Sequence, residues 1–234
     1  MRPRLSLVIP CFNQGHRLAS LVERCVDLVR QEDAEVILVE NGSKDDSGDR
    51  LTELARPHDR LRVVMLRSHA GYGGGILAGL RAARGSVLGW SEAEMQTDPR
   101  SSLEALPFFD VEPQAFVKGL RAGRPMHDVV FSLGMTAFEF AALRALMWDI
   151  NAQPTLCSRE FFESWEDPPD DLSLDLYAFH QALRQGLPVC RFPVAFDASV
   201  NGKREHNLLM SKLSASRSTV AFSLNLRQRL RSAR

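Results

Sequence analysis

The sequence has little of several features that point to particular classes of protein. Only four of its 234 residues are cysteine. Cys11, Cys25, Cys157 and Cys190 form neither a Cys-x-x-Cys pair nor a ligand cluster, which favours reduced thiols in the cytoplasm over disulfides or a zinc site. Nowhere do about 18 apolar residues follow one another, so no membrane-spanning helix is expected.

The sequence also lacks an excess of positive or negative charge. Lysine plus arginine and aspartate plus glutamate each number 29, which gives a formal net charge of +0. Such a chain lacks the general basic surface of a nucleic-acid-binding protein. Residues 1–4 lead directly into an apolar run, so no signal or targeting segment is expected. We therefore predict a cytoplasmic protein, and 234 residues are enough to bury one substantial core.

Short apolar runs alternate with stretches in which apolar residues recur at helical spacing. This alternation is typical of βαβ units, and it predicts an α/β fold with a mostly parallel sheet flanked by helices. Pro10 is expected to end the first strand. The predicted strands are 5–9, 35–39, 63–66 and 87–90, and the clearest helical stretches are 18–29 and 76–83.

Polar residues gather where the predicted strands end, at 10–14, 40–43 and 92–96. Ligands of open α/β sheets bind at the carboxyl ends of the strands. Glu92 and Glu94 are one residue apart, so both side chains leave an extended chain on the same side and could grip one hard cation, Mg2+ or Mn2+. A solvated acidic loop is the alternative. Together the three segments suit a nucleotide-sugar, with polar groups for base and ribose and a cation for the diphosphate.

Nine short motifs follow one another along the chain. They are residues 9–14, 39–43, 71–80, 92–99, 118–121, 148–154, 158–160, 172–176 and 192–194. Their order resembles that of family 2 glycosyltransferases, and within the family it is most similar to the dolichyl-phosphate mannose synthase-like branch. Each motif is weak alone, but the ordered set is specific.

The resemblance implies a GT-A, Rossmann-like domain over residues 1–205. It also implies transfer of a sugar from a nucleotide-diphosphate donor, with a divalent metal, to a polyprenyl phosphate or another acceptor. In the first-strand loop, Pro10, Phe12 and Gln14 match the positions that hold the nucleotide. Glu40 and Asn41 match a pair of aspartates, the second of which reads the base in related enzymes.

The acidic segment carries the metal and diphosphate motif of the family, Asp-Ala-Asp-x-Gln. Glu92, Ala93, Glu94 and Gln96 match it, so the resemblance implies a metal site of Glu92, Glu94 and Gln96, with Glu94 central to catalysis. Arg121 matches a basic residue near the donor phosphates.

The glycine cluster at 71–75 resembles a phosphate-cradling loop but lacks the ending of a P-loop. We interpret it as a close backbone approach to the donor, through Gly73, or to the sheet. Packing of the helix start is the alternative.

The replacements within these motifs leave a second function open. Gln14 and Asn41 stand where the family has carboxylates, and Glu92 and Glu94 are each one methylene longer than aspartate. Ser199 stands where the branch has an arginine. A non-catalytic nucleotide-sugar binding or regulatory protein is therefore the alternative to an enzyme.

The acceptor decides whether a general base is needed. A polyprenyl phosphate is already anionic, so it requires no strong base, whereas a hydroxyl acceptor requires one. Asp149 is the preferred candidate for a catalytic carboxylate, and Asp170 and Asp171 are further candidates.

The segment 206–234 contains no acidic residue. Apolar residues interleave with its basic ones, which predicts a basic amphipathic helix in peripheral contact with an anionic membrane. The alternatives are a terminal helix docked on the body and a partly disordered end. The six basic residues are Lys212, Arg217, Arg227, Arg229, Arg231 and Arg234.

Overall fold

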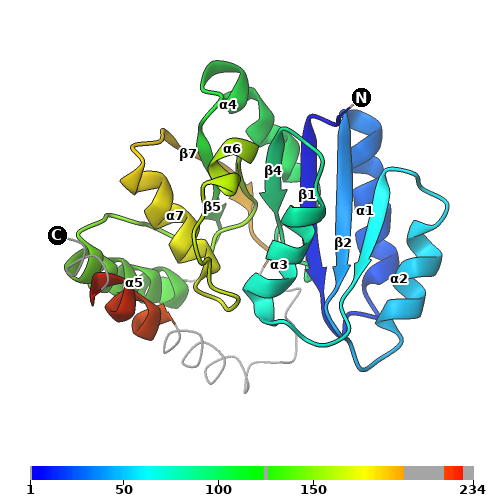
Figure 1. Ribbon diagram of the computed structural model, residues 1–234, viewed down its shortest axis with the longest axis horizontal. Helices are drawn as coiled ribbons and strands as arrows, with labels where there is room; N and C mark the ends of the chain where they lie inside the picture. Colours follow the sequence, from blue (N-terminus) through cyan, green and yellow to red (C-terminus); the bar gives the residue numbers. More distant parts are fainter. Residues whose placement is uncertain (1, 124–125, 198–218, 229–234) are drawn as a thin grey trace.

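The computed structural model describes residues 2–123, 126–197 and 219–228 (Figure 1). They form a seven-stranded sheet in the order β3-β2-β1-β4-β6-β5-β7. The strands are β1 (Leu5–Cys11), β2 (Ala34–Glu40), β3 (Leu61–Met65), β4 (Val87–Trp90), β5 (Phe116–Ala122), β6 (Thr155–Ser158) and β7 (Val189–Ala195).

Six of these strands point the same way. β1 is parallel to β2 and β4, β2 to β3, and β5 to β7, whereas β6 is antiparallel to both β4 and β5. The predicted mostly parallel sheet is thus confirmed. As a consequence, the carboxyl ends of β1, β2, β4 and β5 share one edge of the sheet with the amino end of β6. We call this the site edge.

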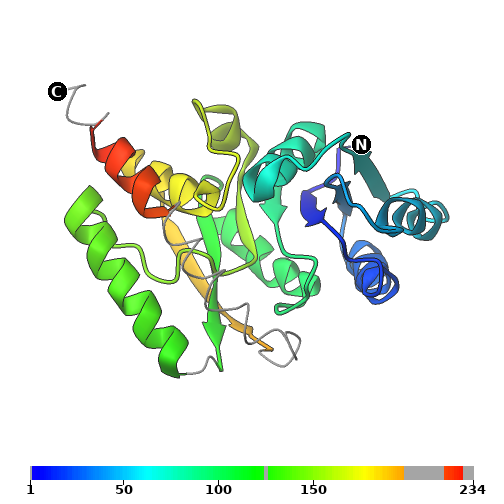
Figure 2. The ribbon, with the colours of Figure 1, turned by 90° about the horizontal axis from the view of Figure 1, so that it is seen from below.

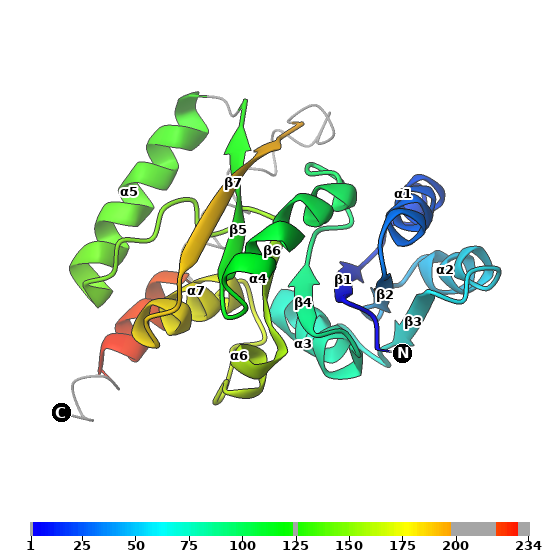
Figure 3. The ribbon, with the colours of Figure 1, turned by 90° about the horizontal axis from the view of Figure 1, so that it is seen from above.

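Helices cover both faces of the sheet (Figure 3). One apolar core lies between the sheet and α1, α2, η1 and α4, and the other lies between the sheet and α3, α6 and α7. The helices are α1 (Leu18–Gln31), α2 (Ser47–Ala55), α3 (Gly71–Ala82), η1 (Pro99–Ala105), α4 (Leu106–Val111), α5 (Met126–Leu143), α6 (Arg159–Glu163) and α7 (Leu174–Arg184).

The first strand does not stop at Pro10, as the sequence predicted, but continues to Cys11. Asn41 N donates to the carbonyl of Cys11, whereas Ser91 N donates to the carbonyl of Val8. The backbone N–H and C=O groups of even-numbered residues in β1 therefore point toward β4. β4 ends before it reaches Pro10. A proline without an N–H is tolerated there because no neighbouring strand needs its donor.

α3 begins earlier than its apolar spacing predicted, at Gly71. A Cβ at Gly73 would lie 2.6 Å from the carbonyl oxygen of Pro169, and one at Gly79 would lie 2.3 Å from Cγ1 of Val8. The glycines let the helix approach its neighbours closely. The cluster thus allows close packing of α3, and a donor contact through Gly73 stays a prediction.

α5 and the helix of residues 219–228 lie at the far end of the molecule, beyond β5 and β7 (Figure 2). Ser223 of the second helix donates to Glu139 of α5 at 2.7 Å, and the Phe222 ring contacts Tyr177 of α7 with centroids 6.4 Å apart. No helix in the described part of the chain is both long and apolar enough to cross a membrane. Outside that part lie Ser199 and the basic residues Lys212, Arg217, Arg229, Arg231 and Arg234.

Candidate functional site

The loop after β4 carries the two glutamates and is anchored to the turn after β1. Gln14 Nε2 donates to Glu94 Oε1 at 3.2 Å, and Arg17 Nη1 donates to the backbone carbonyl of Glu94 at 3.3 Å. The backbone carbonyl of Gln96 accepts from Asp197 N at 2.9 Å. Segments far apart in the sequence therefore fix this acidic loop at the site edge.

The ionisation of Glu92 depends on the groups around it. The pKa of Glu92 is raised to about 7, first because the carboxyl is buried and second because Glu94 is nearby. Arg121 opposes this rise, as do the backbone N–H groups of Thr97 and Gln96. The negative charge of Glu92 is thus only partly compensated by its neighbours, and a bound cation would stabilise its ionised form.

The residues present fit a divalent cation. Gln14 Oε1 is buried and has no hydrogen-bond partner, although the other side-chain atom of the same amide bonds to Glu94. Two carboxylates and an amide oxygen are hard ligands of the kind that Mg2+ and Mn2+ take. Within the described residues no three His, Cys, Asp or Glu side chains form a metal cluster, so a cation here would complete its shell with substrate phosphates or water.

The loops after β1 and β2 are tied together beside the acidic loop. Asn13 Oδ1 accepts from Lys44 N at 2.9 Å. The rings of Phe12 and His69 stack with centroids 4.1 Å apart, and His69 Nδ1 lies 3.2 Å from the Asn41 carbonyl oxygen. Pro10 and Phe12 are half-buried here, so an aromatic surface adjoins the predicted nucleotide loop.

Glu40 and Asn41 are both buried, and both brace backbone. Glu40 accepts from Ser43 N at 2.6 Å and from Gly42 N at 3.1 Å. Asn41 Nδ2 donates to the carbonyl of Gly71 at 2.8 Å, and its Oδ1 accepts from Ala70 N at 3.0 Å. The amide of Asn41 thus holds the start of α3 in place, and base recognition by it stays a prediction.

Arg121, at the end of β5, pairs with the buried Asp149. Its Nε donates to the two carboxylate oxygens of Asp149 at 3.1 and 3.2 Å, and Nη2 makes a further contact with Oδ1. The side chain of Asp149 is 1% exposed and that of Arg121 is 17% exposed. The pair holds a guanidinium at the site edge, where its charge opposes the rise in the pKa of Glu92.

Backbone strain is concentrated in these loops. The described non-glycine residues with positive φ are Asn13, Met95, Arg144, Asp149 and Asp167. Three of the five lie beside predicted site residues: Asn13 next to Gln14, Met95 between Glu94 and Gln96, and Asp149 itself. Such conformations persist where surrounding structure imposes them, and they are frequent at functional sites.

The remaining predicted residues make structural contacts around the site. Ala93 is buried in the core, and Gly73 contacts the segment before α7. Asp171 accepts from Ser173 N at 2.8 Å at the start of α7, and the carbonyl of Asp170 accepts from Gly74 N at 2.8 Å. Asp170 and Asp171 therefore support two helix starts, whereas Asp149 pairs with Arg121.

A buried network behind the acidic loop escaped the sequence analysis. Asp175 of α7 accepts from Tyr72 OH at 2.8 Å and from Trp90 Nε1 at 3.0 Å, and it lies 3.5 Å from Lys118 Nζ. Lys118 also donates to Thr155 Oγ1 at 2.5 Å. Burial lowers the pKa of Lys118 to about 8, and Asp175 opposes this change.

This network touches the site through Tyr72. The pKa of Tyr72 is raised by burial and then by Asp175, with smaller contributions from Glu92 and Glu94. One sequence signal could have found the network: Lys118 is the only charge in the apolar run 115–120, and Asp175 is the only charge in the apolar run 174–179. Buried lysines and aspartates are nearly always paired.

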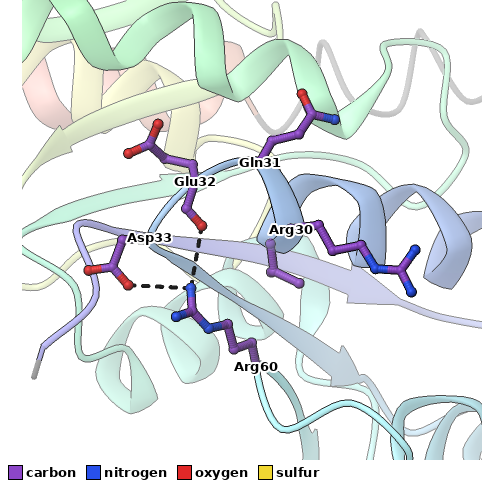
Figure 4. A pocket seen from close by; sticks show the side chains of 6 residues that line it. Arg30, Gln31, Glu32, Asp33 and Arg60 are labelled. Atoms are coloured by element: carbon purple, nitrogen blue, oxygen red, sulfur yellow. Dashed lines mark hydrogen bonds and ion pairs between the residues drawn. The ribbon is translucent and has the colours of Figure 1, made fainter.

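A separate open pocket of about 660 Å3 lies at the opposite edge of the sheet (Figure 4). Arg60 Nη1 contacts Asp33 Oδ1 and the Glu32 carbonyl, both at 3.4 Å, so its charge is compensated. The pocket contains none of the predicted site residues and is not the candidate site. Its lining is Val29, Arg30, Gln31, Glu32, Asp33 and Arg60.

Solved structures confirm the GT-A fold. Glucosyl-3-phosphoglycerate synthase from Mycobacterium tuberculosis, in complex with Mn2+, UDP-glucose and phosphoglyceric acid, aligns with a TM-score of 0.75 at 19% identity, over 96% of this chain and 79% of that chain. The mannosyltransferase PcManGT from Pyrobaculum calidifontis, with GDP-Man and Mn2+, aligns with a TM-score of 0.62 at 19% identity, over 89% of this chain and 60% of that chain.

Relatives in sequence are longer proteins, and this chain matches only about a third of their length. An undecaprenyl-phosphate 4-deoxy-4-formamido-L-arabinose transferase from Pectobacterium carotovorum is 37% identical over 98 residues, which are 41% of this chain and 30% of the relative. The dolichyl-phosphate beta-glucosyltransferase of Drosophila melanogaster is 30% identical over 102 residues, 40% of this chain and 31% of the relative.

Glycosyltransferase AglD of Haloferax volcanii is 27% identical over 205 residues, which are 82% of this chain and 33% of that protein. The family described as Glycosyl transferase family 2 matches residues 6–163. That region includes the first-strand loop, the acidic loop, Arg121 and Asp149. Since the match extends over more than half of the sequence, this chain belongs to glycosyl transferase family 2.

Proposed function

We propose that this protein transfers a sugar from a nucleoside-diphosphate sugar to a polyprenyl phosphate with the help of Mg2+ or Mn2+. The observation that carries the proposal is the acidic loop of Glu92 and Glu94, held by Gln14 and facing the charge of Arg121 at the site edge. The names of the polyprenyl-phosphate transferases and the ligands of the structural neighbours support it.

The donor would lie across the carboxyl ends of β1, β2 and β4. Glu94 and Glu92 would hold the cation, Gln14 would offer its unpartnered amide oxygen, and Gln96 belongs to the same loop as the two glutamates. When bound, the cation neutralises negative charge on the leaving diphosphate. The Phe12–His69 surface borders the space that the nucleoside would occupy.

Arg121 supplies fixed positive charge beside the same diphosphate. Its guanidinium is oriented in advance by Asp149, so little reorganisation is needed when negative charge develops on the leaving group. Asp149 is in this view a positioning residue, because a buried carboxylate engaged by an arginine is poorly suited to accept a proton.

This assignment of Asp149 favours a phosphate acceptor. A phosphate oxygen is anionic at neutral pH and can attack without a general base, whereas a hydroxyl needs one. The other predicted bases, Asp170 and Asp171, support helix starts. A polyprenyl phosphate therefore agrees with the site better than an alcohol.

Calorimetry with UDP and GDP, with and without Mn2+, tests the donor site. Glu94→Gln removes one charge at nearly constant shape, and we expect the Mn2+-dependent nucleotide affinity to fall by about tenfold or more. Glu104→Gln, an exposed glutamate in η1, is the matched control and should leave it unchanged. An unchanged affinity in Glu94→Gln contradicts the metal site.

Transfer of a labelled sugar to undecaprenyl phosphate tests the reaction, with UDP- and GDP-sugars as donors. We expect lipid-linked product that depends on Mn2+ or Mg2+. Two expected carboxylates are amides here, at Gln14 and Asn41, and the two metal-motif residues are glutamates in place of aspartates, which favours one alternative, a non-catalytic nucleotide-sugar binding protein. Mn2+-dependent binding without transfer to phosphate or hydroxyl acceptors would identify that alternative.

A further inference from the structure

α5 has an apolar side that no described element covers. Met126, Val130, Leu133 and Phe140 are 76, 60, 53 and 55% exposed, and Ala137 between them is exposed too. Residues at this spacing lie along one side of a helix. We call these five residues the outward face of α5.

The opposite side of α5 is the buried one. Thr136, Glu139 and Ala142 are buried, and the Ser223 hydroxyl lies within hydrogen-bond distance of both carboxylate oxygens of Glu139, at 2.9 and 2.7 Å. α5 is therefore packed in the usual way on its inner side, and its outer side carries large apolar side chains where a water-facing helix carries charges. Contiguous exposed apolar surface of this kind marks an interaction site.

We propose that the outward face of α5 docks on the surface of an anionic lipid bilayer. Charge favours this partner. Residues 198–234 contain eight lysines and arginines against one glutamate, and the helix of residues 219–228, which includes Arg227, packs against α5 through Ser223. The first exposed charged residue after the outward face, Arg144, is also basic. An apolar helix face in a chain whose carboxyl-terminal segment is basic in sequence suits an anionic lipid surface.

The size of the face argues against a second copy of this chain. A helix of 18 residues is about 27 Å long, so one side of it offers about 270 Å2 at a width of about 10 Å. A stable protein interface buries about 800 Å2 on each partner. A bilayer needs no such minimum, since a single amphipathic helix can insert its apolar side between lipid headgroups.

The position of α5 also agrees with this partner. α5 begins directly after β5, whose last residues include Arg121, so its amino end adjoins the site edge (Figures 2 and 3). Docking there brings the site close to lipid headgroups, where a polyprenyl phosphate would present its phosphate. This last step rests on the proposed function, whereas the exposed face and the charges do not.

The test is flotation of the full-length protein with vesicles of phosphatidylcholine and phosphatidylglycerol, without nucleotide or metal. Leu133→Glu combined with Phe140→Glu puts two charges on the outward face, and we expect the bound fraction to fall about tenfold. The control combines Met65→Glu and Val111→Glu, which are 55 and 79% exposed on other elements, and should bind like the wild type.

Three results overturn the proposal: a wild-type protein that ignores anionic vesicles, a Leu133→Glu, Phe140→Glu variant that binds normally, or a wild-type dimer that this variant converts to monomer. Nucleotide affinity checks that both double variants are folded. If the outward-face variant does not fold, Leu133→Cys with an environment-sensitive dye replaces it. The dye should report an apolar environment on vesicle addition, whereas the same dye at Val111→Cys should not. Since the assay contains no donor, its failure is distinct from failure of sugar transfer.

Discussion

α1 and α5 are both long helices on the outside of the sheet, yet their outer sides differ in character. The exposed residues of α1 include Ser20, Glu23 and Arg30, whereas those of α5 include Leu133 and Phe140. The half of the molecule built on β1 to β4 therefore presents polar residues on its outer helix, although both apolar cores are shared with the other half. The half built on β5 to β7 leaves an apolar helix face for a partner.

The same two halves also divide the proposed chemistry. The first half brings the loops that would hold the nucleotide and the cation, and it resembles an ordinary nucleotide-binding sheet. The second half adds Arg121 and Asp149, and it carries the outward face of α5. The predictions below test how the halves are joined and how each contributes.

The largest effect is expected where the two halves meet, at the buried contacts of Asp175. Asp175 links Tyr72 and Trp90 of the first half with Lys118 of the second. Asp175→Ala leaves a buried lysine without its partner, and we expect a loss of about 3–5 kcal/mol in the free energy of unfolding, measured with urea. Asp110→Ala removes the exposed partner of Arg4 and should cost less than about 1 kcal/mol. Equally small losses of unfolding free energy in the two variants would show that the contacts of Asp175 contribute little to stability.

Within the first half, Asn41→Asp distinguishes two roles of Asn41, support of the loop backbone and recognition of the nucleotide base. The new carboxylate would face the carbonyl of Gly71 where the amide now donates at 2.8 Å. We expect the affinities for UDP, GDP and other nucleotides to fall in parallel, with about 1–3 kcal/mol lost from stability. The exposed Asn151→Asp is the control. A changed ranking among bases would instead support direct base recognition.

At the boundary between the halves, the raised pKa of Glu92 predicts pH-dependent metal binding. A proton competes with the cation below a pKa of about 7, so Mn2+-dependent nucleotide affinity should rise about tenfold from pH 6 to pH 8. The Glu92→Gln variant should bind the nucleotide more weakly, and its affinity should no longer rise between pH 6 and pH 8. The Glu104→Gln variant should keep the rise. A Glu92→Gln variant with the full rise assigns the titration to another group.

The smallest effect is expected in the second half, at Glu139. Burial raises its pKa from 4.5 to about 7, so its contribution to stability is fully present below pH 4.5 and is lost as the pH rises through 7. Glu139→Gln should remove this loss and gain about 1 kcal/mol relative to wild type at pH 8 but not at pH 4. Urea unfolding at both pH values measures it, with the exposed Glu53→Gln as control. The same difference at both pH values would contradict the raised pKa.

Much of the first half could be predicted from the sequence. Strands buried on both faces must be continuous apolar runs, and helices that cover them must show apolar residues at helical spacing. The rule that ligands lie at strand ends then placed Gln14, Glu92 and Glu94 together, and Gln14 and Glu94 do bond to each other. The errors there were local: β1 passes Pro10, because β4 has ended beside it, and α3 starts at Gly71.

The second half depended on tertiary structure. β6 runs antiparallel between β4 and β5, and this insertion is what brings Asp149 to Arg121 at the site edge. Lys118 and Asp175 are 57 residues apart, and no local pattern pairs them.

The sequence alone thus determined the layered α/β fold and the acidic loop, since both follow from periodicity and from the chemistry of adjacent residues. The apolar composition of α5 was also visible in the sequence, but it would equally describe a core helix. Only tertiary structure decided which side of α5 faces out, because exposure depends on which other elements pack against a helix.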